Sequence, residues 1–363
     1  MTETQTDPAL LAIRERIRTA AAERTPLALT GGGTKAFYGE HVGVGLPLDL
    51  RDYRGIVSYE PTELVVTARC GTPLAEVQAT LAEHGQWLAC EPPRFGEGGT
   101  VGGMVAAGLS GPGRAAFGSV RDFVLGARMI DARGQWLAFG GQVMKNVAGY
   151  DISRLLCGSL GVLGPIVEVS LKVLPLPACE RSWQLELEQG PAIRFFNELA
   201  GRPLPVTATA WLDGRAHLRL AGAEAGVRAA ETELRDHHGA QPLDDSFWRE
   251  LRDHRLPSLG APLADGERLW RLSLPSSAAA LALPGQWTVE WGGALRWLRT
   301  DASEAAVRAA ARAAGGSSTR FRGAGDGPVF EPLPAVLMRI HKHLKTEFDP
   351  LGLFNPGRLV AGL

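Results

Sequence analysis

The N-terminal half contains two glycine-dense stretches, Gly31-Gly32-Gly33-Thr34-Lys35 and Gly96-Glu97-Gly98-Gly99-Thr100-Val101-Gly102-Gly103. Glycine has no Cβ, so main-chain N–H groups in such a stretch can come close to a ligand. Successive exposed N–H groups form a concave site that binds anions. Two such sites in one domain favour a ligand with two phosphates, held by main-chain atoms from two sides. A flavin dinucleotide is the simplest candidate.

Strand and helix signals alternate around these stretches. Asp7 and Pro8 favour the start of a helix. A second helix is expected after residue 72, because Leu74, Val77 and Leu81 fall on one side of it. Strands are expected over 27–29, 64–68, 123–130 and 135–139. The region up to residue 177 is therefore expected to form an α+β domain.

Neither glycine stretch is decisive alone, because each is also compatible with an ordinary turn. The stretch Gly111–Ala116 matches the relaxed dinucleotide fingerprint G-x-G-x-x-A, but it contains Pro112 and lacks the strand that should precede it. No stretch supplies the G-x-x-x-x-G-K-[ST] pattern of a phosphate-binding P-loop. The ligand interpretation therefore depends on a further segment of the chain.

A third segment rich in small residues runs from Lys145 through Leu155 to Gly158-Ser159-Leu160-Gly161-Val162-Leu163-Gly164-Pro165-Ile166. In order and spacing, the three segments resemble the flavin domain of the FAD-binding family typified by vanillyl-alcohol oxidase, p-cresol methylhydroxylase and D-lactate dehydrogenases. Phe348-Asp349-Pro350 and Asn355-Pro356-Gly357 resemble the C-terminal signature of that family. The resemblance implies a flavin domain of the vanillyl-alcohol oxidase type.

The resemblance also implies which residues hold FAD. The two pyrophosphate loops would be formed by Gly31, Gly32, Gly33, Thr34 and Lys35, and by Gly98, Gly99, Thr100, Val101 and Gly102. The adenosine end would be lined by Gly158, Ser159, Gly161, Val162 and Ile166. Asp122 and Asn146 would support the isoalloxazine side or its surrounding loops. Relatives with covalently attached flavin carry a histidine in the first loop, where this chain has Thr34 and Lys35, so the expected cofactor is non-covalent FAD.

A narrower resemblance concerns Gly118–Gly126, the stretch from Lys145 to Leu156, and the short total length. These features resemble the smaller FAD-binding subunits of bacterial glycolate oxidases. The resemblance implies two partners, a larger catalytic flavoprotein subunit and an iron–sulfur subunit. Such a complex oxidises glycolate, a small 2-hydroxy acid, to glyoxylate and passes the electrons through flavin to the iron–sulfur subunit.

Catalytic members of the family carry the histidine motifs G-D-G-N-x-H and G-E-H-G, and this chain has neither. Hydride transfer from a 2-hydroxy acid needs a base near the hydroxyl group and cations for the carboxylate. The candidates are His341, His343, Arg339 and Lys345, on a helix expected over 337–345. A solvated basic helix face is the alternative explanation for them. The histidines without polar company in the sequence are expected to be structural or exposed: His41, His84, His217 and His254.

Two other functions therefore stay open beside the complex subunit. One is a self-sufficient FAD-dependent 2-hydroxy acid or alcohol oxidoreductase with His341 or His343 as its base. The other is a non-catalytic assembly module with a flavin fold. Flavin content and the activity of the isolated chain distinguish the three.

The second half carries the pattern of an internal duplication. A shift of 80 residues aligns 211–230 with 291–310, and nine of the twenty positions are identical. Each copy predicts strand–turn–strand–helix, preceded by a strand–helix pair around 183–200 and 268–283. Two βαββα units predict a cap domain over 178–335, with an antiparallel sheet and its helices on one face. Residues 336–363 are expected to return to the FAD-binding domain over 1–177.

The overall composition is that of a globular protein, with 45% hydrophobic and 21% charged residues and a net charge of −1. This charge predicts no general attraction to nucleic acid or to an anionic membrane. The polar N-terminus and the lack of a long apolar run predict a cytoplasmic protein, with membrane association only through partner subunits. No metal site is expected, because Cys70, Cys90, Cys157 and Cys179 form no C-x-x-C pair.

Overall fold

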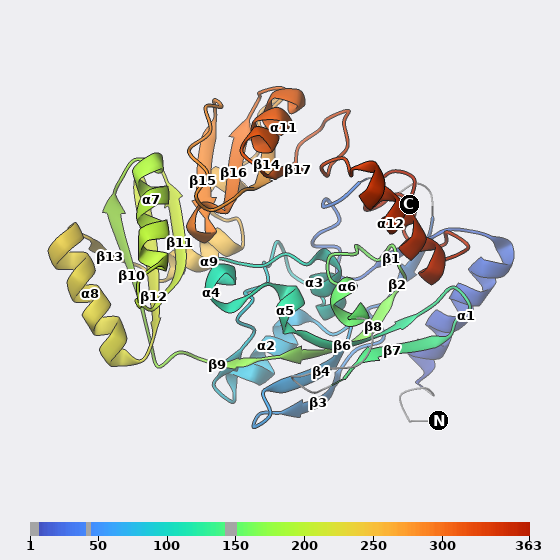
Figure 1. The fold of residues 1–363 in the computed structure, drawn as a ribbon. Coiled ribbons are helices and arrows are strands. Elements are labelled where there is room, and N and C mark those ends of the chain that lie inside the picture. The colour runs from blue at the N-terminus through green and yellow to red at the C-terminus, as the bar shows by residue number, and fades with distance from the viewer. Residues whose placement is uncertain (1–6, 41–44, 142–150) are drawn as a thin grey trace.

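A five-stranded antiparallel sheet, with strand order β3-β4-β8-β6-β7, organises the first half of the chain (Figure 1). The computed structural model describes residues 7–40, 45–141 and 151–363. The strands of this sheet are β3 (Ile56–Glu60), β4 (Val65–Arg69), β6 (Val124–Ile130), β7 (Trp136–Gly140) and β8 (Ile166–Lys172). A turn joins β6 and β7, in which Gly134 N–H donates to the carbonyl oxygen of Asp131 over 3.0 Å.

The helices of this half cover the sheet and its edges: α1 (Pro8–Glu23), α2 (Leu74–Ala82), α3 (Val101–Ala107), α4 (Arg114–Phe117), α5 (Val120–Phe123) and α6 (Ile152–Leu155). Asp7 caps α1 as expected, its carboxylate accepting from Ala9 N–H over 2.9 Å. Apolar residues of α2 and α3 share one buried cluster with β4, β6 and β8. Two small strand pairs complete this half: β1 (Leu27–Thr30) with β2 (Leu46–Asp49), and β5 (Gln86–Trp87) with β9 (Leu174–Pro175).

The second half forms an eight-stranded antiparallel sheet with strand order β13-β10-β12-β11-β15-β16-β14-β17. Its strands are β10 (Cys179–Glu186), β11 (Val206–Leu212), β12 (Arg215–Gly222), β13 (Gln241–Leu243), β14 (Arg268–Ser273), β15 (Gln286–Glu290), β16 (Leu295–Thr300) and β17 (Ser317–Arg322). Read from the centre of the sheet outward, the first copy has the order β11-β12-β10-β13 and the second copy has the corresponding order β15-β16-β14-β17. At the centre, Ala210 of β11 pairs with Glu290 of β15, and these positions are 80 residues apart. The predicted duplication is confirmed, with a pseudo-two-fold axis at this pair.

One predicted element of the duplication is wrong. The first copy has its helix, α7 (Gln189–Ala200), but the segment 274–285 between β14 and β15 contains no helix. Pro275 and Pro284 bracket this segment. The carbonyl groups of Ala278 and Ala279 accept hydrogen bonds from the guanidinium of Arg296, the latter over 2.6 Å, instead of from a following helical turn. The buried guanidinium of Arg296 thus stabilises a non-helical conformation of this alanine-rich segment.

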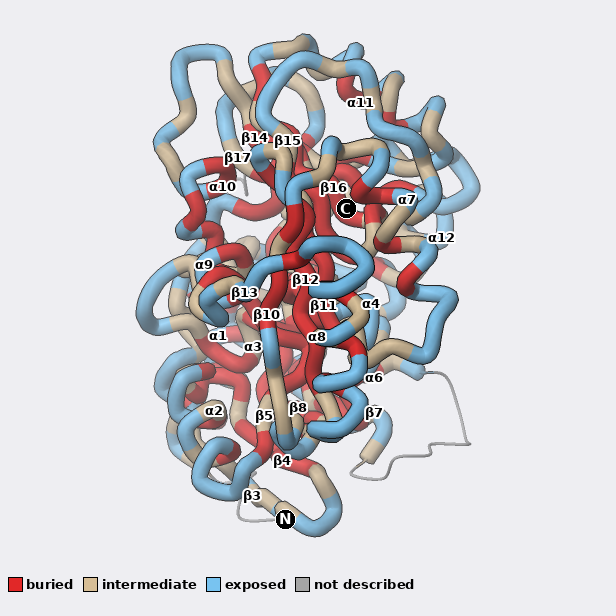
Figure 2. Tube along the Cα trace, turned by 90° about the vertical axis from the view of Figure 1, so that its left-hand side faces the viewer, coloured by how far each residue is buried: buried red, intermediate tan, exposed pale blue. Residues whose placement is uncertain are grey.

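The two faces of the eight-stranded sheet are covered differently. Helices α7, α8 (Glu224–His238) and α11 (Glu304–Ala313) pack on one face, as expected for the repeats. The opposite face packs on α9 (Ser246–Arg252), α10 (Pro257–Gly260) and residues of the first half such as Tyr38 and Leu109. The expectation of helices on one face only is therefore wrong for α9 and α10. Figure 2 shows buried segments running continuously from this sheet toward the first half.

The C-terminal segment returns to the first half, as expected. After α12 (Ala335–Phe348) the tail pairs with β1: Leu27 N–H donates to the carbonyl of Leu353 over 2.7 Å, and Asn355 N–H to that of Leu27 over 3.0 Å. The domain boundaries at 177 and 335 stay predictions. Within the described ranges, no helix has the length and apolar character needed to cross a membrane.

Candidate functional site

The two glycine loops lie directly against each other. A Cβ on Gly32 would stand 1.7 Å from the carbonyl oxygen of Gly98, and one on Gly31 would stand 2.6 Å from the hydroxyl of Thr100. No L side chain fits at such distances, so main chain packs on main chain here. The first loop follows β1 and the second precedes α3, and the fold thereby joins the ends of these two elements.

A cavity of about 220 Å³ opens beside this contact. It is lined by the first loop and by residues of α3, the third small-residue segment and the tail: Ala28, Leu29, Thr30, Gly31, Gly32, Gly33, Thr34, Lys35, Ala36, Thr100, Gly103, Ala106, Ala107, Leu160, Asn355 and Arg358. A smaller cavity of about 90 Å³ shares several of these residues, including Gly31, Thr100 and Leu160. The two cavities therefore flank one glycine-lined wall.

The loops present main-chain donors that the protein does not use. In the described part of the chain, the N–H groups of Gly31–Lys35 and Gly96–Thr100 donate to no protein acceptor. Helix α3 begins at Val101 with Thr100 as its N-cap, so its positive end also lies at this wall. Free N–H groups and a helix start are suited to bind phosphate oxygens.

The third small-residue segment divides between two cavities. Gly161 and Ile166 line the smaller of the two cavities beside the glycine loops. Gly158, Ser159 and Val162 instead line a separate cavity of about 180 Å³. Five residues were predicted here for the adenosine end, and the structure brings only two of them to the glycine-lined wall.

The C-terminal tail supplies two lining residues that sequence reasoning did not assign to the site. Asn355 accepts from Leu29 N–H and donates to the carbonyl of Leu160, each over 2.7 Å. Arg358 donates to the carbonyls of Tyr38 over 2.7 Å and Glu40 over 3.0 Å. The Asn-Pro-Gly signature was the available signal, but it did not show which segments the tail joins.

Lys35 is the cation of the first loop that faces the larger cavity. Burial lowers the pKa of its ammonium group to about 8, although nearby Asp253 acts in the opposite direction. Its Nζ lies 5.7 Å from the centre of the Phe95 ring. Lys35 thus carries a partly desolvated charge between the glycine loops and the eight-stranded sheet.

Several residues that the sequence assigned to the FAD site do not line the larger cavity. Asp122 closes the first turn of α5, accepting from the N–H and the hydroxyl of Ser119, each over 2.8 Å. Val101 is buried in the core, whereas Gly102 lines the smaller cavity. Gly98 and Gly99 contact the first loop rather than the cavity. Asn146 lies outside the described residues.

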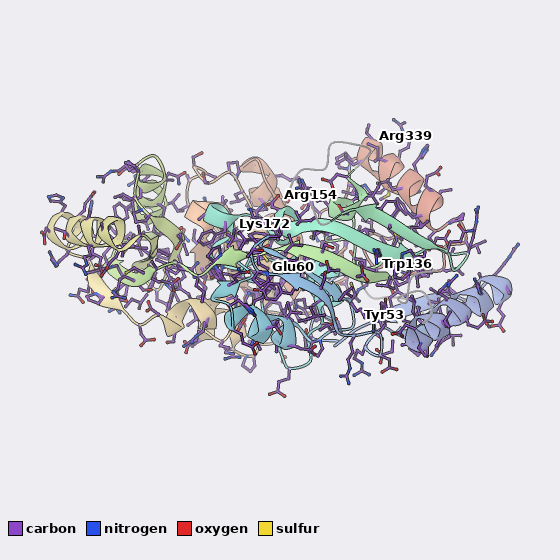
Figure 3. The ribbon with its side chains drawn as sticks, turned by 90° about the horizontal axis from the view of Figure 1, so that it is seen from below. Tyr53, Glu60, Trp136, Arg154, Lys172 and Arg339 are labelled. Atoms are coloured by element: carbon purple, nitrogen blue, oxygen red, sulfur yellow. The ribbon has the colours of Figure 1, made fainter. Side chains whose placement is uncertain are left out.

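The predicted catalytic side chains line no part of the glycine-loop cavities. Arg339 and His343 are exposed on α12, and Figure 3 shows Arg339 at the outer edge of that helix. His341 lines the separate cavity with Gly158. Lys345 is buried and donates to the carbonyls of Val162 and Phe354 and to Asp349, over 2.7, 2.8 and 2.7 Å, so its role is structural. The catalytic role of Arg339, His341 and His343 stays a prediction that the cavity lining does not support.

Comparison with known proteins agrees with this geometry. Residues 11–140 match a family described as "FAD binding domain". The glycolate oxidase subunit GlcD of Bacillus subtilis (strain 168) is 29% identical, over 46% of this chain and 36% of that protein. A D-lactate dehydrogenase of Anaerostipes hadrus is 32% identical, over 38% of this chain and 28% of that protein.

A solved structure of alkyldihydroxyacetonephosphate synthase shares the fold, with a TM-score of 0.66 and 14% identity over 96% of this chain and 75% of that one. Over nearly its full length, the chain is similar to the glycolate oxidase subunit GlcE of Escherichia coli (strain K12). The two are 48% identical over 352 residues, which is 97% of each protein. The narrower resemblance expected from the sequence is thereby confirmed, and the chain belongs to the family of the glycolate oxidase subunit GlcE.

Proposed function

We propose that this chain is the FAD-binding subunit of a glycolate oxidase complex, and that it holds FAD non-covalently at the glycine-loop wall. One observation carries the proposal. Two glycine loops in main-chain contact lie beside a cavity of about 220 Å³, and their N–H groups donate to no acceptor among the described residues. The relative that matches nearly the whole chain is a glycolate oxidase subunit.

The residues present fit a dinucleotide. Gly31 and Gly32 leave main-chain atoms accessible where any Cβ would collide with the second loop. The N-terminus of α3 and the ammonium group of Lys35 add positive potential for a diphosphate. Bound FAD would supply the two-electron acceptor for a 2-hydroxy acid. The chain itself would bind and orient the cofactor and exclude water from it.

The proposal also covers the partner subunits and the cellular location of the chain. The relatives named GlcE and GlcD are both glycolate oxidase subunits. We infer a complex with a larger catalytic flavoprotein subunit and an iron–sulfur subunit, in the cytoplasm. Purification of the tagged chain from its host, followed by counting flavin and iron per chain, tests this assembly. A chain that purifies alone from a host expressing the other subunits would contradict it.

Filling the cavity tests the cofactor site. Ala106 lines both glycine-loop cavities, so its replacement by phenylalanine places a ring where the ligand would lie. We expect Ala106→Phe to weaken FAD binding at least tenfold, since it removes shape complementarity without altering the main chain. Flavin absorbance and fluorescence quenching during titration with FAD measure the affinity.

Ala229→Phe is the matched control, because Ala229 is an exposed alanine on α8, far from the glycine loops in the fold. We expect this variant to bind FAD as the parent chain does. Circular dichroism establishes that both variants are folded. Unchanged FAD affinity in Ala106→Phe would place the cofactor elsewhere and overturn the site assignment.

A further inference from the structure

A second, small cavity lies between the eight-stranded sheet and the glycine-rich half. It measures about 20 Å³, which is room for one or two water molecules. Its charged and polar lining is formed by Arg271 on β14, Glu290 on β15, His254 after α9, Arg252 on α9 and Ser110. Phe95, Trp297 and Phe321 form its aromatic walls. A buried carboxyl group and a buried imidazole beside half-buried guanidinium groups require an explanation at a cavity of this size.

Arg271 is the cation at this cavity for which the described residues supply no acceptor. Among the residues that the structure describes, it makes no ion pair and no hydrogen bond, and its guanidinium carbon lies 5.5 Å from the centre of the Trp291 ring. Arg252 beside it is already paired, since its guanidinium donates to both carboxylate oxygens of Asp253 over 2.8 Å. A planar guanidinium without a partner matches a carboxylate by two parallel hydrogen bonds.

His254 adds an unsatisfied polar atom. The side chain is 7% exposed, and its Nδ1 has no hydrogen-bond partner within residues 7–40, 45–141 and 151–363. The ring packs among Phe95, Trp297 and Phe321, with centroids 4.8, 4.6 and 5.3 Å away. A buried polar group without a partner costs stability, so such a group points to a ligand or to a functional requirement. Burial first, and then Arg322 and Arg271, lower the pKa of His254 to about 3, so the ring is neutral at physiological pH.

Glu290 completes the polar lining. Its Oε1 accepts from the indole N–H of Trp297 over 2.7 Å. Burial raises the pKa of this carboxyl group to about 7. The hydrogen bond from Trp297 and the charge of Arg271 act against the rise, and the charge of Glu91 acts with it. Arg252 also lines the cavity, but Asp253 neutralises it. Near neutral pH a substantial fraction of Glu290 is therefore protonated and can donate a hydrogen bond.

We propose that Arg271, His254 and Glu290 form a subsite for the carboxylate group of a small organic acid. The guanidinium of Arg271 would bind the two carboxylate oxygens, and the neutral ring of His254 and protonated Glu290 would contribute hydrogen bonds. The cavity admits a head group of this size and not a nucleotide. This inference rests on the proposed function, because it places an acid substrate beside the cofactor cavity: residues 106–107 line that cavity and 109–111 line the subsite.

A titration with glycolate tests the subsite. Binding of glycolate to the FAD-loaded chain is measured by calorimetry, with tryptophan fluorescence as a second readout because Trp297 and Trp291 lie at the subsite. We expect Arg271→Gln and His254→Asn each to weaken glycolate binding at least tenfold while FAD affinity is unchanged. Ethylene glycol, which lacks the carboxylate, is expected not to compete.

The chain offers matched controls for both variants. His217 is also buried, and its Nδ1 has no partner in the part of the chain that the structure describes, but it stacks on Phe247 at 4.3 Å and lines none of the cavities described above. Arg194 is an exposed arginine on α7. His217→Asn and Arg194→Gln are expected to bind glycolate as the parent chain does.

The outcomes separate this inference from the proposed function. If the chain binds FAD but glycolate binding is absent, or is the same in Arg271→Gln as in the parent, the subsite is wrong and the cofactor site stands. If the chain binds glycolate with this variant pattern but takes up no FAD, the subsite stands and the proposed function fails. If Arg271→Gln does not fold, His254→Asn provides the test: glycolate binding equal to that of the parent chain would rule out the subsite.

Discussion

Gly32 illustrates what a single residue decides in this protein. Its missing Cβ allows the first loop to touch the carbonyl of Gly98, which brings two sets of main-chain donors to one wall. The clustered glycines predicted two main-chain sites on one ligand, because only glycine permits such close approach. The direct contact between the two loops was not predicted from the sequence. His254 was not predictable in the same way. Its neighbours Arg271 and Glu290 are distant in the sequence, so the residue was expected to be structural or exposed.

Glu290 permits a prediction about pH and stability. Its pKa in the folded chain is about 7, above its ordinary value of 4.5, because burial disfavours the charged form. Between these pH values the folded chain holds a proton that the unfolded chain has lost. Stability contributed by this residue therefore falls as pH rises from 4.5 to about 7 and stays low above that.

Glu290→Gln should remove this dependence. We expect the variant to gain stability relative to the parent as pH rises through this window, by about 3 kcal/mol at most at pH 8. The glutamine oxygen can still accept from the indole of Trp297. Thermal midpoints of parent and variant at pH 5 and pH 8 give the difference directly. An equal difference at both values would show that Glu290 is ionised in the folded chain throughout.

At the scale of elements, the C-terminal tail connects the segments that form the glycine-lined wall. Asn355 joins the end of β1 to the third small-residue segment by bonds to Leu29 and Leu160. We expect Asn355→Ala to weaken FAD binding by about tenfold, since both bonded segments line the cavity and each lost buried bond costs about 1 kcal/mol. Titration with FAD measures the loss.

Asn197→Ala is the control for this prediction. Asn197 on α7 also joins distant segments, donating to the carbonyls of Ser276 over 3.2 Å and Gly292 over 2.9 Å, but it lies away from the glycine loops. Both variants should lower the thermal midpoint, and only Asn355→Ala should change FAD affinity. Equal FAD affinity in both would mean that the tail stabilises the fold without shaping the wall.

The elements also show where sequence patterns stop being informative. Strands β1, β4, β6 and β7 of the first half, the strands of the two βαββα units, and α1, α2 and α12 were predicted because local capping, periodicity and turn residues specify them. The missing helix over 274–285 was not, because the decision there comes from Arg296, which takes carbonyl groups that a helix would need. The catalytic candidates on α12 failed to reach the cavity for a similar reason: the sequence identifies a basic helix face but not the direction it faces.

At the scale of the whole molecule, the question is how the duplicated sheet is fixed to the glycine-rich half. A buried ion pair crosses between them: Arg219 on β12 donates to the two carboxylate oxygens of Glu91 over 2.6 and 3.1 Å. Glu91 also accepts from the N–H of Gly113. Nearby, the indole N–H of Trp291 donates to the carbonyl of Gly111 over 3.0 Å. The subsite at Arg271 lies on the same face of the sheet, so its geometry depends on this attachment.

Replacing one partner of this ion pair should lower the free energy of unfolding more than replacing both partners. Glu91→Leu leaves the guanidinium of Arg219, which is 3% exposed, with Glu180 at 4.0 Å as its remaining ion-pair partner among the described residues. We expect a loss of about 3 kcal/mol, because an uncompensated buried charge is more costly than an apolar pair of similar volume. The double variant Glu91→Leu with Arg219→Leu should recover part of that loss. Denaturant unfolding of the parent, both single variants and the double variant gives the coupling free energy. A double variant less stable than Glu91→Leu would show that Arg219 attaches the sheet by itself, through its bond to Thr207 and its packing on Trp248, and that the ion pair is not what joins the two halves.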